Sequence, residues 1–137
     1  MPPGRARTAV VALALAALCV PAAIALQGEP SEHADSAKLK NPVPVTAESV
    51  AAGKALFLQR CQGCHGPDGR GGPVIGYAKV PPNLTDDKWE YGGSDGEIFD
   101  TIKSGVPPDY DMEPWGDRIK DVDIWNLVNF VRSLHGQ

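Results

Sequence analysis

Cys61-Gln62-Gly63-Cys64-His65 is the stretch of this 137-residue sequence that decides its fold. It places two thiols three positions apart, and an imidazole follows the second thiol directly. On a helical turn, each thiol can add to one of the two vinyl groups of a haem, and the imidazole is carried beneath the iron. The C-x-x-C-H pattern is the signal for covalent haem attachment. We therefore expect one haem c, bound through Cys61 and Cys64, with His65 as an iron ligand.

Two other uses of this cysteine pair fit the sequence less well. A redox dithiol of the thioredoxin kind begins a helix after a strand, where the helix dipole lowers the pKa of the thiol. Here the pair ends a predicted helix that no strand precedes. A zinc site needs four ligands, and the only other histidines are His33, in a polar segment, and His135, near the C-terminus.

The sequence offers one candidate methionine for the sixth iron ligand. Met1 and Met112 are the only methionines, and Met1 belongs to the N-terminal leader described below. A lone methionine often fills a gap in a core. However, Met112 lies between Asp111 and Glu113, which are unusual neighbours for a core position, on a loop that can bring its thioether to a metal. We predict that Met112 completes the coordination, a ligand set that raises the reduction potential.

Three helices are predicted, and the class is all-α. Thr46 can cap a helix over 47–60, Ser94 and Glu97 form a capping box before a helix that ends at Gly105, and Asp121 can cap the last helix. In that last helix apolar residues recur at helical spacing: Ile124, Leu127, Val128, Val131 and Leu134. The 15 glycines and 13 prolines predict long loops elsewhere, and no strand of convincing length is present.

The N-terminal part of the chain is predicted to direct export. Arg5 and Arg7 precede an apolar run over 9–18, and small residues at 23 and 25 fit a signal-peptidase site. We expect a signal peptide at 1–25, a flexible linker at 26–45 and the folded domain at 46–137, in the bacterial periplasm. The alternative is an uncleaved membrane anchor, because 8–26 is just long enough to cross a bilayer.

The charge excludes one class of partner. The formal net charge is −4, and removing residues 1–25 leaves 11 basic and 17 acidic residues, a charge of −6. No basic cluster is present, so we expect no binding to nucleic acid. An acidic carrier is suited to redox proteins that present positive charge.

Several short stretches together resemble the class I cytochrome c family, especially its small bacterial periplasmic members and the similar domains of oxidase and dehydrogenase subunits. The resemblance covers about 47–135. It rests on Gly53 and Phe57, the attachment string with Gly66, the stretch 81–85, Met112 with Pro114 and Trp115, and Leu127 with Phe130. It implies three to five short helices around one haem.

The resemblance also implies roles for particular residues. The first and last helices would cross at Gly53. The Pro82 carbonyl would accept a hydrogen bond from His65 and fix its tautomer. Apart from the resemblance, Trp115 belongs to a set of aromatic residues that we expect to pack against the porphyrin or between helices. The sequence departs from the family at Glu113, where proline often follows the ligating methionine.

Electron transfer is the function these features predict. With both axial positions filled by protein, the iron can only change charge by one electron, so we expect an electron carrier and not an enzyme. The partners would be redox proteins, with a membrane tether through the N-terminus as an option. An alternative is a dedicated electron-accepting subunit of a larger dehydrogenase or oxidase. A haem peroxidase or gas sensor requires an open sixth position, which Met112 argues against.

Overall fold

The computed structural model describes residues 35–76 and 79–135, and within these ranges all regular secondary structure is helical. The helices are α2 (Ala47–Arg60), α3 (Gln62–His65), α4 (Asp95–Ser104) and α5 (Asp121–Ser133). The described part contains no strand, which confirms the all-α class. None of these helices has the length and apolar character needed to cross a bilayer. The expected signal peptide at 1–25 lies outside the described residues.

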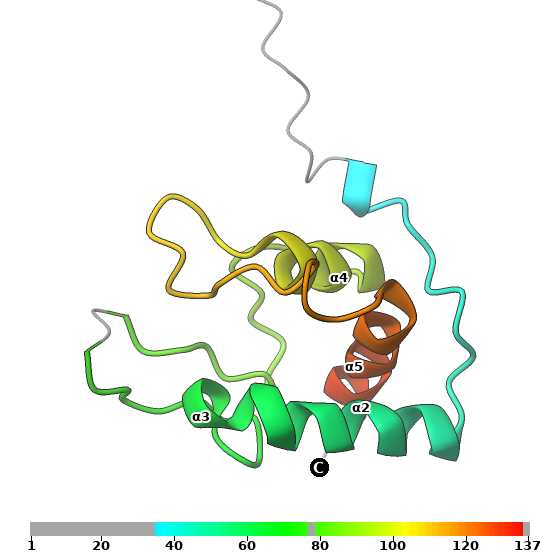
Figure 1. The fold of residues 1–137 in the computed structure, drawn as a ribbon, viewed down its shortest axis with the longest axis horizontal. Coiled ribbons are helices and arrows are strands. Elements are labelled where there is room, and N and C mark those ends of the chain that lie inside the picture. Colours follow the sequence, from blue (N-terminus) through cyan, green and yellow to red (C-terminus); the bar gives the residue numbers. More distant parts are fainter. Residues whose placement is uncertain (1–34, 77–78, 136–137) are drawn as a thin grey trace, which may run out of the picture.

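The first and last helices cross closely, as Figure 1 shows for α2 and α5. Gly53 makes this approach possible: a Cβ atom placed on it would lie 2.0 Å from the Asn126 carbonyl oxygen and 2.8 Å from Phe130 Cβ. Phe57, one turn further along α2, is buried and its ring centroid lies 5.1 Å from that of Phe130. The crossing implied by the resemblance is therefore confirmed, with Leu127 also fully buried beside it.

The helix α4 begins at the predicted capping box and packs on α5. The Ser94 hydroxyl accepts from the Glu97 N–H, and the Glu97 carboxylate accepts from the Ser94 N–H. Phe99 stacks on Trp125 of α5, with ring centroids 4.0 Å apart and an interplanar angle of 15°. This stack joins α4 to the core formed at the α2–α5 crossing.

The start of α5 differs from the expectation in one residue. Lys120 is the N-cap, no side chain caps the helix, and Asp121 is its first helical residue. The Asp121 carboxylate instead accepts from Lys103 Nζ at 2.9 Å. The prediction that Asp121 caps the helix was wrong, because an acidic residue also favours the first turn, where it interacts with the helix dipole.

Residues 35–45, which fall in the expected flexible linker, lie against the folded helices, and Figure 1 shows this segment beside α5 and the start of α2. Ser36 is buried, and its carbonyl oxygen lies where a side chain on Gly96 would be. Asn41 donates to the side chain of Asn129 at 2.7 Å and to the Trp125 carbonyl at 3.3 Å. The packed part of the protein thus extends before Thr46.

Asn129, on α5, is the polar centre of this contact. Its amide donates to Ser49 Oγ at 2.7 Å and to the carbonyls of Val43 and Pro44 at 3.2 and 3.3 Å. The amide is 1 % exposed, so an unpaired polar atom here would cost about 1–3 kcal/mol. The network satisfies it, and in doing so ties the N-terminal segment to both crossing helices.

Candidate haem-binding site

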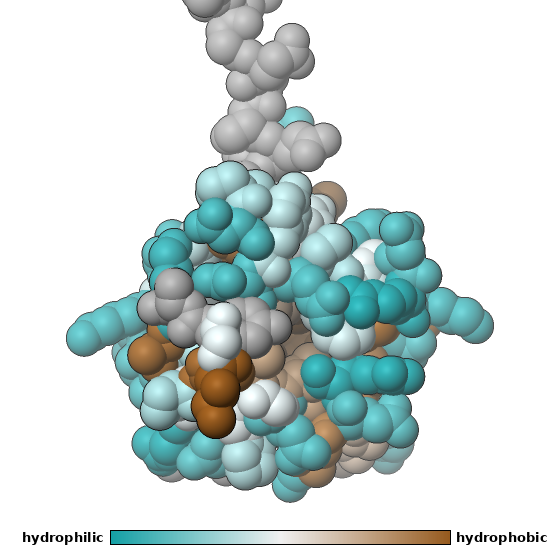
Figure 2. Space-filling model, turned by 60° about the vertical axis from the view of Figure 1, so that its left-hand side comes forward, coloured by the Kyte–Doolittle hydropathy of each residue, from teal (hydrophilic) through white to brown (hydrophobic). Residues whose placement is uncertain are grey.

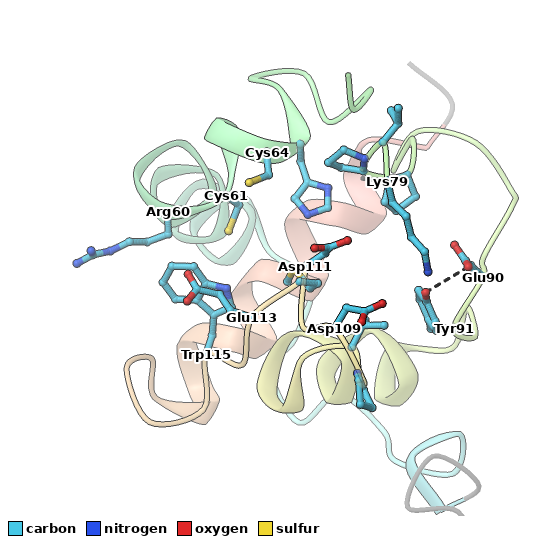
Figure 3. Close-up of a pocket in the computed structure, with 17 residues that line it drawn as sticks. Arg60, Cys61, Cys64, Lys79, Glu90, Tyr91, Asp109, Asp111, Glu113 and Trp115 are labelled. Atoms are coloured by element: carbon cyan, nitrogen blue, oxygen red, sulfur yellow. Dashed lines mark hydrogen bonds between the residues drawn. The ribbon is translucent and has the colours of Figure 1, made fainter. Parts of the chain in front are cut away.

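Two adjoining cavities occupy the side of the molecule that carries the attachment string. They share seven lining residues from four parts of the chain: Cys61, His65, Pro82, Glu90, Tyr91, Val106 and Met112. The inner cavity is lined mainly by apolar side chains from α2, α4 and α5, among them Phe57, Ile98 and Leu127. The outer cavity carries most of the charged residues, and Figure 3 shows its walls. One continuous hollow therefore has an apolar interior and a polar mouth.

The two thiols lie where α2 passes into α3. The Cys61 N–H donates to the Phe57 carbonyl at 2.8 Å, and the Cys61 carbonyl accepts from the N–H groups of Cys64 and His65 at 3.1 and 3.0 Å. This single turn brings both thiols to the outer cavity. Neither is in a disulfide. Burial, with a smaller contribution from the Cys64 thiol, raises the pKa of Cys61 to about 11, so Cys61 is a neutral thiol at pH 7.

His65 is kept as a neutral imidazole by burial. Loss of solvent lowers its pKa, while the backbone of Pro82 acts in the opposite direction and more weakly. Its Nδ1 is buried and completes no hydrogen bond of normal geometry with the described residues. The Pro82 backbone is thus close enough to influence the imidazole without a well-formed bond. Neutral imidazole is the form that binds metals.

Pro82 reaches His65 because a glycine-rich loop is folded back beneath it. The Gly71 N–H donates to the His65 carbonyl at 2.9 Å, and the Leu84 N–H donates to the Gly69 carbonyl at 2.7 Å. A Cβ on Gly71 would lie 2.3 Å from the Pro81 carbonyl oxygen, and the φ angle of Gly71 is +74°. Only glycine suits this contact, which sets Pro81 and Pro82 against the histidine.

Met112 comes to the same hollow on the loop between α4 and α5. Its carbonyl accepts from the Val106 N–H at 2.9 Å, and the Trp115 N–H donates to the Ile102 carbonyl at 3.1 Å. Gly105, with φ +72°, ends α4 so close to the returning chain that a Cβ would lie 2.7 Å from the Met112 carbonyl oxygen. The base of the loop is therefore fixed to the end of α4, and Met112 and Trp115 both line the outer cavity.

The mouth of the hollow is acidic, which the sequence indicated only through its net charge. Four carboxylates line it against two cations, Arg60 and Lys79. Three of the carboxylates come from the loop between α4 and α5 that carries Met112, and Figure 3 shows them on one side of the cavity: Asp109, Asp111 and Glu113. The fourth, Glu90, accepts from the Tyr91 hydroxyl at 3.2 Å. The carboxylates come from separate parts of the chain, so the sequence alone does not show that they surround one opening.

Exposed apolar side chains occur near this mouth. Val80 lines the outer cavity and is 64 % exposed, and Ile75, on the loop before it, is fully exposed. Figure 2 shows strongly hydrophobic side chains on this face, beside a hollow bordered by hydrophilic ones. An apolar patch with a charged rim is typical of a surface that contacts another protein.

His135, near the C-terminus, packs against the folded part of the protein. Its ring stacks on Trp89, with centroids 5.3 Å apart and an interplanar angle of 17°, and Nδ1 lies 3.5 Å from an Asp87 carboxylate oxygen. Trp89 lines the inner cavity, whereas His135 lines neither cavity. The histidine therefore supports one wall and does not add a ligand to the site.

The residues present fit a covalently attached haem. The walls supply two free thiols, a buried neutral imidazole and a thioether, and the interior beside them is apolar. Groups of three or more His, Cys, Asp or Glu residues arranged to hold a metal ion do not occur among the described residues. One imidazole and one thioether are an axial ligand pair used by haem iron in cytochromes c, so the donor set fits haem.

A family model described as cytochrome c oxidase, cbb3-type, subunit III matches residues 48–131. The chain is 37 % identical over 103 residues to the cbb3-type cytochrome c oxidase subunit FixP of Azorhizobium caulinodans, covering 71 % of this chain and 33 % of that protein. It is 35 % identical over 89 residues to subunit CcoP of Cereibacter sphaeroides, covering 63 % and 28 %. The chain thus spans about a third of the length of these relatives.

Solved structures show the same fold. Cytochrome cL from Hyphomicrobium denitrificans matches with a TM-score of 0.56 and 26 % identity, covering 75 % of this chain and 61 % of that one. Cytochrome cL from Methylophaga aminisulfidivorans matches with a TM-score of 0.54 and 26 % identity, covering 81 % and 71 %. The described helices are therefore arranged as in cytochromes c.

Proposed function

Because this chain belongs to the family of the cbb3-type cytochrome c oxidase subunit III domain, we propose that it carries single electrons through one haem c held by the residues of the hollow. Haem c supplies a one-electron couple when it is bound. In the proposal, Cys61 and Cys64 form the thioether links, and His65 and Met112 are the axial ligands. The observation that carries the proposal is that the loop residue Met112 lines the same hollow as Cys61, Cys64 and His65, which lie far from it in the sequence.

The remaining residues of the hollow would set the environment of the group. Pro82 would orient His65 through its carbonyl, and Trp115 would pack at the outer wall. The apolar inner cavity would exclude water, which keeps the reorganisation that accompanies a change of charge small. The acidic mouth would stabilise the oxidised, more positive state and attract a cationic partner.

Replacing Met112 with alanine is expected to open the sixth position without removing the haem. The wild-type protein should be low-spin in both oxidation states and should not bind carbon monoxide rapidly. The M112A protein should bind carbon monoxide in the ferrous state and show a lower reduction potential, because the thioether ligand that raises it is lost. Optical spectra and potentiometry measure both effects.

The control for this experiment is Val122→Ala, which shortens an exposed side chain that lines neither cavity and should leave spin state and potential as they are in the wild type. If M112A stays low-spin and unreactive to carbon monoxide, Met112 is not the ligand. If the wild-type protein already binds carbon monoxide rapidly, the carrier assignment is replaced by that of a sensor or peroxidase.

We propose a periplasmic carrier that exchanges electrons with larger redox proteins. Export is supported by the leader-like sequence of residues 1–25. A second candidate, a dedicated subunit of an oxidase, is favoured by the similarity to proteins named as oxidase subunits. In either role the acidic rim would meet a surface with positive charge.

Charge removal at the rim tests this partner chemistry. The double variant Asp109→Asn with Asp111→Asn should lower the rate of electron exchange with a basic redox protein by about tenfold at low salt, because electrostatic steering is weakened. Stopped-flow kinetics over a range of ionic strength measure this rate. The matched variant Asp35→Asn with Glu48→Gln removes two charges that do not line the cavity, and it should retain the wild-type rate.

Equal rates for the two double variants would contradict the steering by the rim. A chain recovered only in a stable complex, and inert toward other acceptors, would identify the dedicated subunit. A monomer that exchanges electrons with several acceptors at salt-dependent rates would identify the diffusing carrier.

A further inference from the structure

The loop that carries Met112 is fixed at its base by main-chain hydrogen bonds, but these do not hold the residues directly after the methionine. Val106 bonds to the Met112 carbonyl, and Trp115 and Gly116 bond back to the end of α4. Between these anchors lie Glu113 and Pro114. Side-chain contacts to these two residues therefore bear directly on how firmly the Met112 thioether is placed.

Arg118 contacts all three residues that follow Met112. Its Nη2 donates to the Pro114 carbonyl at 2.7 Å and lies 2.8 Å from a Glu113 carboxylate oxygen. Its guanidinium carbon lies 4.2 Å from the centre of the Trp115 ring. The planar guanidinium combines directional donors with an aromatic-stacking face, which a lysine cannot do. The Arg118 side chain therefore links residues 113–115 to one another.

These contacts are expected to restrict the conformations of the loop more than they raise the free energy of unfolding of the whole protein. The Arg118 and Glu113 side chains are about half exposed, at 48 % and 55 %, and exposed ion pairs contribute little to the free energy of unfolding. Their effect is instead on the conformations open to a short loop. A segment with few buried contacts opens locally at low cost unless such contacts restrain it.

We propose that Arg118 is the positioning residue for Met112: by clamping Glu113, Pro114 and Trp115, it holds the thioether toward the cavity that contains His65. This inference rests on the proposed role of Met112 as an iron ligand. A loop released from the clamp would leave the sixth position open more often, and a competing ligand would bind more tightly by the same factor.

The test uses the exported full-length chain with its haem, in the ferric state, and imidazole as the competing ligand. Arg118→Ala should lower the apparent dissociation constant of imidazole by about tenfold, as expected if the open fraction rises tenfold. The charge-transfer absorption of thioether-ligated ferric haem should weaken in parallel. Arg118→Lys, which keeps the charge but not the fork or the stacking face, should lie between the wild type and the alanine variant.

Two further variants separate the contributions. Glu113→Gln removes the ion pair but leaves the Pro114 and Trp115 contacts, so it should show a smaller gain in imidazole affinity at low salt. Lys120→Ala removes a neighbouring cation that does not line the haem cavity, and it should bind imidazole as the wild type does. If R118A is too poorly folded to purify, R118K and E113Q still decide the question.

An imidazole affinity in R118A equal to that of the wild type and K120A would overturn the clamp. So would a weaker charge-transfer band in R118A that is matched by K120A, because loss of a nearby positive charge alone would then explain it. The Met112→Ala experiment reports separately on the ligand itself. If M112A opens the sixth position but R118A does not change imidazole binding, the proposed function stands and only the positioning role fails.

Discussion

Gly53→Ala is expected to destabilise the protein by about 3 kcal/mol or more, an exceptional loss for the addition of one methyl group. The added Cβ would lie 2.0 Å from the Asn126 carbonyl oxygen, a main-chain atom that cannot rotate away. The helices α2 and α5 would have to separate. In an exposed helix the same substitution stabilises by about 0.5–1 kcal/mol. A loss of stability at Gly53 would therefore show that the two helices cross closely there.

The measurement is the free energy of unfolding of the haem-bearing protein in guanidinium chloride. Gly63→Ala is the matched control, because an added Cβ on Gly63 meets no atom within 4 Å. Gly63 is an exposed residue of α3, so this control should unfold at the wild-type midpoint or slightly above it. A G53A protein as stable as G63A would mean that the two helices do not approach as the structure has them, and the burial of Phe57 against Phe130 would lose its explanation.

The helices and the attachment string could be predicted from the sequence because their signals are local. The Ser94–Glu97 capping box and the Thr46 cap each involve residues three positions apart, and both are formed. The C-x-x-C-H string is likewise complete within one turn. For the start of α5 the local signal was ambiguous, since Asp121 suits both the cap and the first turn. In the structure Asp121 is the first helical residue and contacts Lys103.

The packed N-terminal segment could not be predicted in the same way. Asn41 and Asn129 are 88 residues apart, and each reads as an ordinary polar residue in its own surroundings. The prolines around Asn41 correctly indicate an irregular chain, but an irregular chain can still be held firmly by side-chain hydrogen bonds. Only the three-dimensional structure shows that Asn129 faces that segment.

The same reason limits what the sequence could indicate about the site. Cys61, His65 and Met112 could be proposed from the sequence because haem chemistry restricts the residue types and because the chain has one methionine outside its N-terminal leader. The acidic mouth and the Arg118 contacts depend on how the loop between α4 and α5 folds back on itself. No short pattern encodes that path, so the electrostatic surroundings of the ligands emerged only from the structure.

Loss of both thiols has the largest effect that we expect on the site. The double variant Cys61→Ser with Cys64→Ser should be exported without covalent haem, so its intact mass should lack the added haem that the wild type carries. Hydroxyls at these positions are far weaker nucleophiles than thiols and form no thioether with a vinyl group. Because a domain of this size has a small core, the variant should also lose most of its cooperative unfolding transition.

Each single serine variant should retain one thioether, and a Gln62→Ala variant is the matched control within the same turn. Gln62 is exposed and lines neither cavity, so this variant should keep the full haem mass and the wild-type spectrum. Burial raises the pKa of Cys61 to about 11, so this thiol is protonated and a poor nucleophile at pH 7 in the folded chain. If the double serine variant still carries haem after denaturation and acid extraction, the thioether links lie elsewhere, and the site built around Cys61 and Cys64 must be abandoned.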